Sequence, residues 1–398
     1  MKKIAIVSSY DEGCGNAYFT KVLVDSLNNA DTQVECIGLN LKLTQSVISG
    51  VRKKANKHID EICSKLKCYD GVNIQLEAGL YGTIPKDIIC RLKKLALANK
   101  NTSITLHSPR LMPDASANRE MIKLFLKLRL FSALKLYMNS KITGIPLQIN
   151  YNLIKFFAKN NINLIVHTER AKEQIKLFFD YDKVAVHPLK IVPSNTVIDS
   201  TVLDKIRSKY NFTERDVIIG MFGFINEYKG HSLALDAMEL LPQNYKLLFF
   251  GRQHPQTLKT NTLVDKYLYK LQNDILKSKR LKNRVYFMGE YATPDFINLA
   301  GSVDFCWLPY VENGQDGSGI ASICLDVSNR VMLSSSFAFD ELLRIEPLRN
   351  GYNRFDIGNA IELADKTKFN DVIYNDSKLL TCYSVDTQAE LYRSLTLS

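Results

Sequence analysis

The feature that most constrains the fold is an alternation of short apolar runs with amphipathic stretches along the first half of the chain. The apolar runs predict strands at Lys3–Ser9, Gln33–Leu39, Val72–Leu76, Ser103–His107, Leu164–His167 and Val184–Pro188. Apolar residues at helical spacing lie between them, at Ala17–Leu27, Ser46–Leu66 and Lys86–Ala98. Runs that are apolar throughout are typical of parallel strands covered by helices on both faces. The order therefore predicts a doubly wound α/β domain.

The second half of the chain repeats this scheme. Its predicted strands are Val217–Phe224, Tyr245–Phe250, Arg284–Met288, Val303–Leu308 and Val331–Ser334. Its predicted helices are His231–Leu241, Leu263–Ser278, Pro294–Ala300 and Gly319–Val327. A length of 398 residues suits two domains of about 200 residues each. We therefore expect two Rossmann-like doubly wound domains that face a central cleft, because ligands bind outside the carboxyl ends of such sheets.

The expected domain boundaries follow from a short Pro-Ser-Asn segment, residues 193–195, which reads as a linker. The first domain is then 1–195 and the second is 196–380. A last segment, 381–398, contains a predicted helix, Asp386–Leu397, with Asp386 as its N-cap. We expect this helix to fold back on the first domain.

Hydropathy and cysteine usage indicate a cytoplasmic protein. No apolar run approaches the ~20 residues that span a bilayer, and the first residues are too quickly polar for a signal peptide. The eight cysteines include no Cys-x-x-Cys pair, which argues against zinc and thioredoxin-type sites. A reducing, cytoplasmic compartment is expected, with a peripheral position at the inner face of the cell membrane as an open alternative.

The net charge of +11 lies entirely in the first half of the chain. Residues 1–195 contain 29 Lys and Arg against 16 Asp and Glu, whereas residues 196–398 contain 23 against 25. A basic half indicates an anionic partner, such as acidic lipid, nucleic acid or a phosphate-bearing substrate, unless it only aids solubility. No nucleic-acid-binding motif is present, so nucleic acid is not expected as a partner.

One candidate anion site follows the strand Val217–Phe224. Gly223 and Gly230 permit tight turns on either side of Lys229, which stands at the start of the next helix. Helix N-termini favour anions through their dipole and their free N–H groups. Lys229 is therefore predicted to hold a nucleotide diphosphate, although a surface lysine beside a turn glycine is an equally good interpretation of this motif alone.

A second candidate loop follows the strand Val303–Leu308. It runs from Asp316 through Ser318, Gly319 and Ile320 into a helix of small residues. The backbone N–H groups of Ser318, Gly319 and Ile320 are predicted to contact phosphate or ribose oxygens, and Asp316 to accept sugar hydroxyls. An ordinary βα loop is the alternative interpretation.

Together the two motifs resemble glycosyltransferase family four, a retaining GT-B family that uses nucleotide sugars. The resemblance covers essentially the whole chain, and 329–341 matches the family only loosely. Further matching segments are Leu248–Gly251, Phe287–Gly289, Asp304–Tyr310, Gly13–Asn16, Asn73–Gln75, Thr105–His107 and Val166–His167.

The resemblance implies a set of roles for individual residues. Lys229 matches the diphosphate lysine, and His107 matches the active-site histidine at the end of a first-domain strand. Asp316 and Cys324 fall on the two acids of the family's Glu-x7-Glu motif. The remaining donor-binding candidates are Gly13 and Gly15 in the loop after the first strand, Gly223, Met288 with Glu290 beside the base, and Ser318, Gly319 and Ile320.

Three positions depart from the family pattern. Asp316 is a shortened first acid, Cys324 is no acid, and Phe224 replaces the diphosphate arginine. Arg252, after the next strand, is the candidate to supply the missing charge. Catalysis is expected to rest on fixed donors aimed at the leaving phosphate, with His107, Lys229 and Asp316 as the catalytic set. The Asp-x-Asp stretch Asp180–Asp182 is interpreted as a loop cap rather than a metal signature, so no metal or other cofactor is expected.

The acceptor side is predicted from the segment 121–159, which is basic, apolar and aromatic. Residues 121–168 contain seven Lys and Arg and no Asp or Glu. Basic apolar helices bind anionic membrane surfaces, whereas a core helix with snorkelling lysines is the alternative. The membrane interpretation implies a glycan or lipid-linked acceptor in surface polysaccharide or lipopolysaccharide synthesis.

Two other functions compete with transfer. Phe224 and Cys324 favour a degenerate, non-catalytic GT-B protein that binds sugar nucleotides or a partner enzyme. A sugar-nucleotide epimerase would need acids around the anomeric carbon, which the sequence does not offer.

Overall fold

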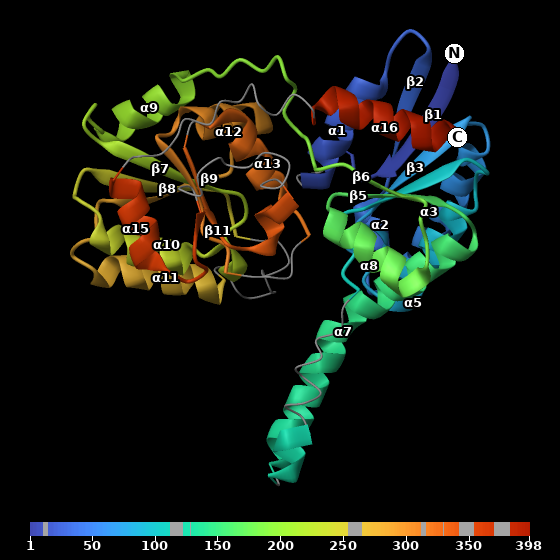
Figure 1. Cartoon of the computed structure of the whole chain (residues 1–398), viewed down its shortest axis with the longest axis horizontal. Coiled ribbons are helices and arrows are strands. Elements are labelled where there is room, and N and C mark those ends of the chain that lie inside the picture. Colours follow the sequence, from blue (N-terminus) through green and yellow to red (C-terminus); the bar gives the residue numbers. More distant parts are fainter. Residues whose placement is uncertain are drawn as a thin grey trace. The chain divides into compact units, whose positions relative to one another are not determined.

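The computed structural model describes residues 1–10, 15–111, 122–127, 129–253, 265–311, 316–328, 330–341, 354–369 and 383–398. The chain divides into two compact units (Figure 1). The first unit comprises Met1–Pro188 together with Val385–Ser398, and the second comprises Leu189–Ser384. The division therefore falls shortly before the expected linker, and the C-terminal helix belongs to the first unit.

The first unit is built on a parallel sheet that has six strands within the described residues, in the order β2-β1-β3-β4-β5-β6. The strands are β1 (Lys2–Ser8), β2 (Thr32–Gly38), β3 (Gly71–Leu76), β4 (Thr102–Leu106), β5 (Asn163–Val166) and β6 (Val184–Val186). The strands β3 and β4 are buried along their whole length. Burial of this kind explains the continuously apolar run Ile4–Val7 of β1. In β3 and β4 the buried polar side chains of Asn73, Gln75, Ser103 and Thr105 are instead hydrogen-bonded to one another.

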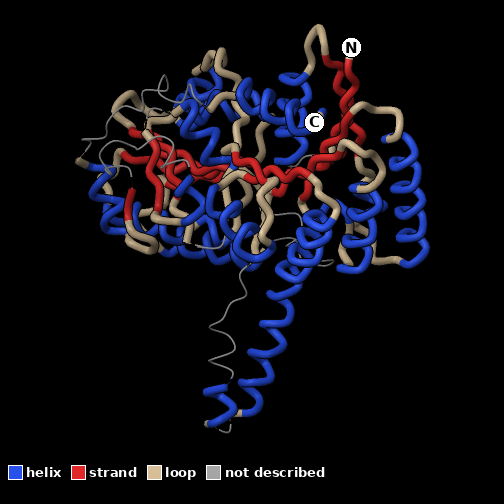
Figure 2. Tube along the Cα trace, turned by 45° about the vertical axis from the view of Figure 1, so that its right-hand side comes forward, coloured by secondary structure: helices blue, strands red, loops and turns tan. Residues whose placement is uncertain are grey.

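Helices cover both faces of the first sheet, as Figures 1 and 2 show. They are α1 (Gly15–Leu27), α2 (Leu41–Thr44), α3 (Ser49–Leu66), α4 (Ala78–Tyr81), α5 (Pro85–Ala96), α7 (Leu130–Lys159), α8 (Glu169–Phe179) and α16 (Val385–Leu397). The helix α5 begins on Pro85, whose fixed φ suits the first helical position. Its buried residues Ile88, Leu92 and Leu95 recur at helical spacing and face the core.

The C-terminal helix α16 packs on α1 and on the strands β3 and β4. Polar contacts fix its position: the Thr105 hydroxyl donates to the Tyr392 Oη at 3.1 Å, and Ser103 Oγ lies 2.8 Å from Thr396 Oγ1. The expected N-cap, Asp386, is instead the second residue of the helix, within its first turn. A carboxylate in the first turn still interacts favourably with the helix dipole, and the expected cap lies two residues inside the N-cap position.

The second unit has a parallel sheet of the same kind, with six strands among the described residues in the order β12-β11-β10-β7-β8-β9. Its strands are β7 (Val217–Phe222), β8 (Tyr245–Phe250), β9 (Val285–Gly289), β10 (Phe305–Leu308), β11 (Val331–Ser334) and β12 (Arg354–Phe355). Its helical elements are α9 (Thr201–Tyr210), η1 (Glu227–Lys229), α10 (His231–Leu240), α11 (Lys266–Lys277), α12 (Thr293–Ser302), α13 (Gly319–Val327), η3 (Phe337–Phe339) and α15 (Ala360–Lys368).

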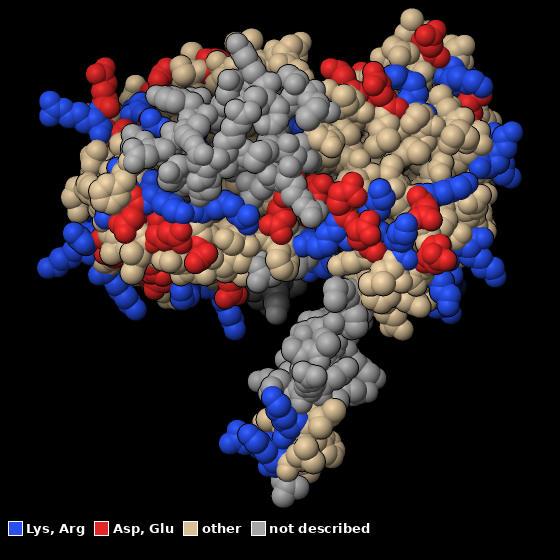
Figure 3. All heavy atoms as spheres, in the orientation of Figure 1, with Lys and Arg blue, Asp and Glu red and all other residues tan. Residues whose placement is uncertain are grey.

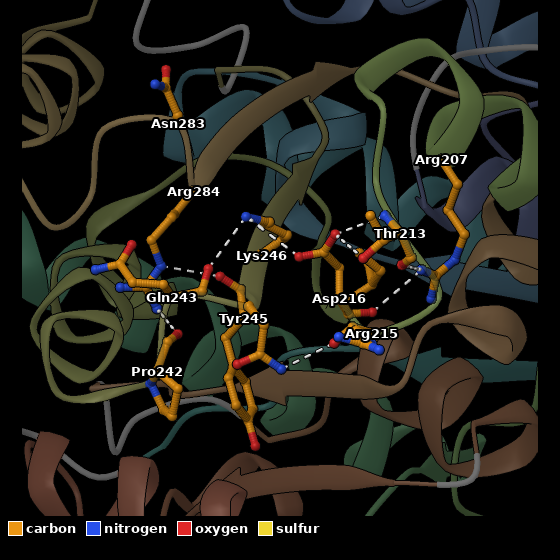
Figure 4. A network of polar contacts seen from close by, with 12 residues as sticks. Arg207, Thr213, Arg215, Asp216, Pro242, Gln243, Tyr245, Lys246, Asn283 and Arg284 are labelled. Carbon is orange, nitrogen blue, oxygen red and sulfur yellow. Dashed lines mark hydrogen bonds and ion pairs between the residues drawn. The ribbon is translucent and has the colours of Figure 1, made fainter.

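A polar network connects the amino ends of β7, β8 and β9 in the second sheet (Figure 4). Lys246, at the start of β8, forms an ion pair with Asp216 at 3.5 Å. Asp216 Oδ2 accepts a hydrogen bond from the Thr213 backbone N–H at 2.7 Å. The buried Arg284 guanidinium donates to the carbonyls of Pro242 (2.7 Å) and Tyr245 (3.1 Å). The charges at this edge are therefore paired with one another and with backbone groups.

Each sheet contains one point at which the strand order reverses. This switch point lies between β1 and β3 in the first unit and between β7 and β10 in the second. Ligands of open parallel sheets bind outside the carboxyl ends of the strands at such points. The loops that follow β7 and β10, and those that follow the first-unit strands, are therefore where a functional site is expected.

Candidate functional site

Lys229 is a buried lysine at the switch point of the second unit. It is the last residue of η1, and its side chain is only 5% exposed. The Nζ atom donates to the Tyr310 hydroxyl at 2.8 Å and lies 4.8 Å from the centre of the Tyr310 ring. None of the ion pairs found among the described residues includes Lys229. Burial lowers the pKa of this ammonium, so a bound anion would stabilise its charged form.

Glycines bring the loops after β7, β8 and β10 into close contact. Gly230 has φ +75°, and a Cβ atom there would lie 1.8 Å from the Pro309 carbonyl oxygen. Gly251 passes so close to Gly223 that a Cβ atom would lie 2.1 Å from the Gly223 oxygen. A Cβ atom on Gly223 itself, at φ +94°, would meet Lys229 Nζ at 3.1 Å. Only glycine permits this packing, and it places the Lys229 ammonium against the Gly223 backbone.

The loop after β10 connects the lysine to the start of α13. Tyr310 follows β10, is 2% exposed, and its Oη lies 3.0 Å from Ser318 Oγ. Ser318 is the N-cap of α13 and accepts a hydrogen bond from the Ala321 backbone N–H at 3.2 Å. The Ser334 hydroxyl in β11 donates to the Tyr310 carbonyl at 2.7 Å. Lys229, Tyr310 and Ser318 thus form one hydrogen-bonded line that ends at a helix N-terminus, where free N–H groups favour anions.

The two positions expected to carry acids differ in the structure. Asp316 is 6% exposed and precedes the Ser318 N-cap by two residues. Cys324 is fully buried inside α13. A hydrogen bond with Cys306 of β10, together with burial, raises the pKa of the Cys324 thiol. Cys324 therefore stays a neutral core thiol and offers no acceptor for a sugar hydroxyl.

The other donor-side candidates lie at the same edge of the second sheet. Arg252, after β8, forms an ion pair with Glu290, after β9, at 3.2 Å. Its guanidinium carbon lies 5.9 Å from the centre of the Phe224 ring. Both charged side chains are about half exposed, at 46% and 52%, so their ion pair can be exchanged for a ligand. Met288 is the penultimate residue of β9 and is half-buried.

The remaining donor-side candidates lie at the starts of helices. Gly319 and Ile320 form the first turn of α13, and a Cβ atom on Gly223 would lie 3.2 Å from Ile320 Cγ1. In the first unit, Gly15 is the first residue of α1. Gly13 lies outside the described residues.

A pair of histidines lies at the carboxyl edge of the first sheet. His107 follows β4 and His167 follows β5; His167 Nε2 lies 3.2 Å from His107 Nδ1. A carbonyl oxygen can only accept, so His167 Nδ1 carries the proton that it donates to the His187 carbonyl at 3.0 Å. His107 Nε2 lies 2.7 Å from Gln75 Oε1. The Phe19 ring packs edge-on against both imidazoles.

Burial sets the protonation of this histidine pair. It lowers the pKa of His167 to about 4 and the pKa of His107 well below its usual value. Both rings are therefore neutral near pH 7 and suited to hydrogen bonding rather than to ion pairing. A functional role was predicted for His107 but not for His167. The sequence signal that could have identified His167 is its position at the end of a predicted strand, like that of His107.

Glu77 is a further candidate that the sequence analysis did not identify. It follows β3, next to the switch point of the first sheet, and its Oε2 accepts a hydrogen bond from Ser108 Oγ at 3.1 Å. Burial raises the pKa of this carboxyl group. A partly desolvated carboxylate at this edge is suited to accept hydrogen bonds from hydroxyl groups.

A hollow of about 770 Å³ lies at the opposite, amino-terminal edge of the first sheet. Its lining includes the starts of β4, β5 and β6 and the end of α16. Two of its polar side chains are already used, because Asn99 donates to Leu66 and Tyr69 carbonyls and Asn163 donates to the Leu395 carbonyl. This hollow lies at the opposite end of the strands from the first-unit candidates His107, His167 and Glu77.

The described residues contain neither a metal-binding cluster nor a membrane-spanning helix. Among them, no cluster of three or more His, Cys, Asp or Glu side chains is placed to hold a metal ion. Within the same residues, none of the helices is both long and apolar enough to cross a membrane.

Comparison with known proteins identifies the fold. No protein-family model and no curated protein sequence matches the chain. Solved structures match it over nearly its whole length. HepE from Anabaena, in complex with UDP and glucose, has a TM-score of 0.66 at 13% identity, with 99% of each chain covered. Sucrose-phosphate synthase from Thermosynechococcus elongatus has a TM-score of 0.66 at 13% identity, again with 99% of each chain covered.

A third match extends the comparison to another organism. A glycosyltransferase from Rickettsia africae has a TM-score of 0.63 at 14% identity, covering 99% of this chain and 98% of the other. The chain therefore has the GT-B fold of two Rossmann-like units, as the sequence predicted.

Proposed function

We propose that the protein is a glycosyltransferase that moves a sugar from a nucleotide-diphosphate sugar to an acceptor hydroxyl. The observation that carries the proposal is the buried ammonium of Lys229 at the switch point of the second sheet, held by Tyr310 without a carboxylate partner among the described ion pairs. An anion that enters this place restores the charge balance of the site. The resemblance to a nucleotide-sugar family, and the UDP and glucose in the HepE structure, agree with this proposal.

The reaction breaks the bond between the anomeric carbon and the diphosphate oxygen and forms a bond to the acceptor oxygen. The acceptor proton goes to the leaving phosphate, as a front-side, retaining mechanism allows. Negative charge grows on that phosphate in the transition state, so fixed positive groups aimed at it lower the barrier. Lys229 supplies a charge, and the start of α13 at Ser318–Ile320 supplies N–H groups. The proposed reaction uses no metal.

Other side chains of the second unit complete the proposed donor site. Arg252 is the candidate for the second positive charge, since Phe224 occupies the position of the family arginine and the two side chains are adjacent. Met288 and Glu290 lie at the same sheet edge and are proposed to line the base. Asp316 is proposed to accept hydroxyl groups of the sugar.

The acceptor is proposed to bind the first unit. His107 Nδ1 lies against His167 and its Nε2 lies against Gln75, so an acceptor hydroxyl group is proposed to take the place of Gln75 at Nε2. The basic segment 121–159 is proposed to contact an anionic membrane surface, which would make the acceptor a glycan or lipid-linked intermediate. Surface polysaccharide or lipopolysaccharide synthesis is the proposed context.

A donor-turnover assay tests the proposal. The protein is incubated with UDP-, GDP-, ADP- and CMP-sugars, and nucleotide release is followed with and without candidate glycan acceptors. We expect slow hydrolysis of one donor by the protein alone, faster release with a suitable acceptor, and loss of both in Lys229→Ala. Absence of release from every donor would contradict the transferase proposal.

A specific observation favours one alternative, a degenerate GT-B protein that binds sugar nucleotides or a partner enzyme. Cys324 is buried and neutral where an acid is expected, so one hydroxyl contact of the donor is missing. Measuring nucleotide binding and donor turnover on the same protein distinguishes the two functions. A nucleotide that binds through Lys229 but is never turned over would favour the alternative.

A further inference from the structure

The helix α7 has two parts that differ in what they contact. At its C-terminal part, Ile149, Leu153 and Phe157 are buried in the core of the first unit. A helix of 30 residues is about 45 Å long, so its N-terminal part extends beyond this packed region (Figure 1). Residues 122–126 form a separate short helical segment just before it. We call the described residues of 122–134 the arm tip.

The arm tip exposes large apolar side chains rather than burying them. The exposed fractions are Ile122 56%, Phe125 62%, Leu126 80%, Leu130 55%, Phe131 90% and Leu134 55%. Isolated exposed apolar residues are ordinary on a protein surface, but a contiguous group marks an interaction site. A core-helix interpretation therefore holds for the C-terminal part of α7 and fails for the arm tip.

The charges on the arm tip have one sign. Lys123, Lys127 and Arg129 are all exposed, and 121–168 contains no Asp or Glu. Figure 3 shows Lys and Arg side chains gathered at the end of the arm, with no acidic side chain among the coloured atoms there. A second copy of the same basic tip would be repelled, whereas a negatively charged lipid surface attracts both the cations and the apolar side chains.

We propose that the arm tip is a membrane-docking element that inserts Phe125, Leu126 and Phe131 into the interface of an anionic bilayer, while Lys123, Lys127 and Arg129 contact lipid headgroups. The proposed membrane contact of the basic segment 121–159 is thereby confined to the first part of that segment. The second part, with Leu153 and Phe157 in the core, serves to anchor the arm to the first unit. Membrane docking by the arm tip rests on the proposed role of the first unit in acceptor binding, and it is independent of the donor site.

Sedimentation with vesicles tests the apolar part of the proposal. The full chain is mixed with vesicles of phosphatidylcholine alone or of phosphatidylcholine and phosphatidylglycerol in equal parts. We expect binding to the anionic vesicles, and strong loss of binding in a variant that combines Phe125→Ser, Leu126→Ser and Phe131→Ser. The matched control combines Leu177→Ser and Leu276→Ser, which are exposed by 82% and 72% elsewhere, and should bind like the wild type.

Charge reversal tests the electrostatic part. Lys123→Glu with Lys127→Glu is expected to weaken binding to anionic vesicles by about tenfold or more. The same reversal at Lys53 and Lys54, which are exposed on α3, should have a much smaller effect. Raising the salt concentration should weaken wild-type binding in the same direction, since exposed charges are screened.

Insertion can be observed directly with a single reporter. Trp307 is the one tryptophan of the chain and is fully buried, so its emission is a constant background. In Phe131→Trp, emission should shift to shorter wavelength when anionic vesicles are added and should remain unchanged with neutral ones.

Three results would overturn the proposal. They are no binding to anionic vesicles, equal binding by the Phe125→Ser, Leu126→Ser, Phe131→Ser variant (the arm-tip Ser variant), or a dimer in sedimentation equilibrium that the arm-tip Ser variant abolishes. The last result would identify the arm tip as an interface between copies of the chain. Donor turnover is measured on the same preparations, so that a failure of membrane binding can be distinguished from a failure of the proposed glycosyl transfer. Turnover of a water-soluble donor should survive in the arm-tip Ser variant.

Discussion

The ammonium nitrogen of Lys229 lies 2.8 Å from the hydroxyl oxygen of Tyr310, and both side chains are almost completely buried. The hydroxyl can accept one hydrogen bond but cannot neutralise a charge. The ammonium is therefore held ready for an anion, which has consequences for nucleotide binding and for the stability of the second unit.

Nucleotide binding should weaken as the pH rises. The pKa of Lys229 is lowered by burial in the free protein, and a bound diphosphate favours the charged form. Binding is therefore linked to proton uptake once the pH exceeds that lowered pKa. There we expect the dissociation constant to rise by up to about tenfold per pH unit. Isothermal titration between neutral pH and about pH 10 measures this, and Lys229→Met should give weak binding with a flat profile.

Removing the Tyr310 hydroxyl should destabilise the second unit and impair binding. Tyr310→Phe leaves Lys229 and Ser318 without their shared partner, at an expected cost of about 1–3 kcal/mol in the free energy of unfolding. Denaturation followed by Trp307 fluorescence measures this cost in the same unit. Tyr286→Phe, which loses one hydrogen bond to the Asn283 carbonyl on a less buried surface, is the control and should cost less. Equal losses in both variants would contradict the account.

Gly230 should tolerate no side chain. Gly230→Ala places Cβ 1.8 Å from the Pro309 oxygen at a left-handed φ of +75°, so the loops must separate. Gly358 has a similar φ of +81° but no atom within 4 Å of a Cβ atom, so Gly358→Ala isolates the backbone strain. We expect about 1–2 kcal/mol for Gly358→Ala and about 3 kcal/mol or more for Gly230→Ala. Urea midpoints of the two variants provide the comparison.

His167 should make the first unit sensitive to acid. Its folded-state pKa of about 4 lies below the ordinary value of 6.5, so between these values the unfolded chain binds a proton that the folded chain does not. The stabilisation is complete above pH 6.5 and is lost as the pH falls toward 4, by roughly 3 kcal/mol in total. Far-UV circular dichroism during urea unfolding at several pH values should show this slope.

The matched variant for this prediction is His167→Gln. It should be less stable at pH 7 because it loses ring packing on Phe19, but its stability should change less between pH 6.5 and 4. An unchanged slope in the variant would show that His167 is not the residue responsible.

Most of the fold was predictable because burial leaves a strong imprint on the sequence. The strand β1 is buried from Ile4 to Ser8 and its run Ile4–Val7 is continuously apolar. The strands β3 and β4 are buried as well, but they alternate apolar residues with polar ones that are hydrogen-bonded inside the sheet. The strand β12 has only two residues, Arg354 and Phe355, and such a short segment carries no periodic signal. The prediction of Asp386 as the N-cap was wrong by two residues, since Asp is favoured both at the cap and in the first turn.

The site was predictable only in part. The glycines on either side of Lys229 predicted the turns. Nothing in the sequence indicated that Tyr310 would be the hydrogen-bond partner of Lys229. The contact between His107 and His167 depends on the pairing of β4 with β5, which is a tertiary property. The division of α7 into a packed part and an exposed tip also depends on tertiary structure. It could not be predicted from the sequence because the basic and apolar composition is similar along both parts.

The most direct test of the central claim is a thermal-shift measurement with nucleotides on three proteins: wild type, Lys229→Met and Lys246→Met. Lys246 is the matched control, since it is a largely buried lysine of the same unit, but it lies at the opposite sheet edge and is paired with Asp216. A ligand that binds only the folded state raises its melting temperature. The account predicts that one nucleotide diphosphate raises the melting temperature of the wild type and of Lys246→Met, and leaves that of Lys229→Met unchanged. An equal rise in all three proteins, or no rise with any nucleotide at millimolar concentration, would contradict it.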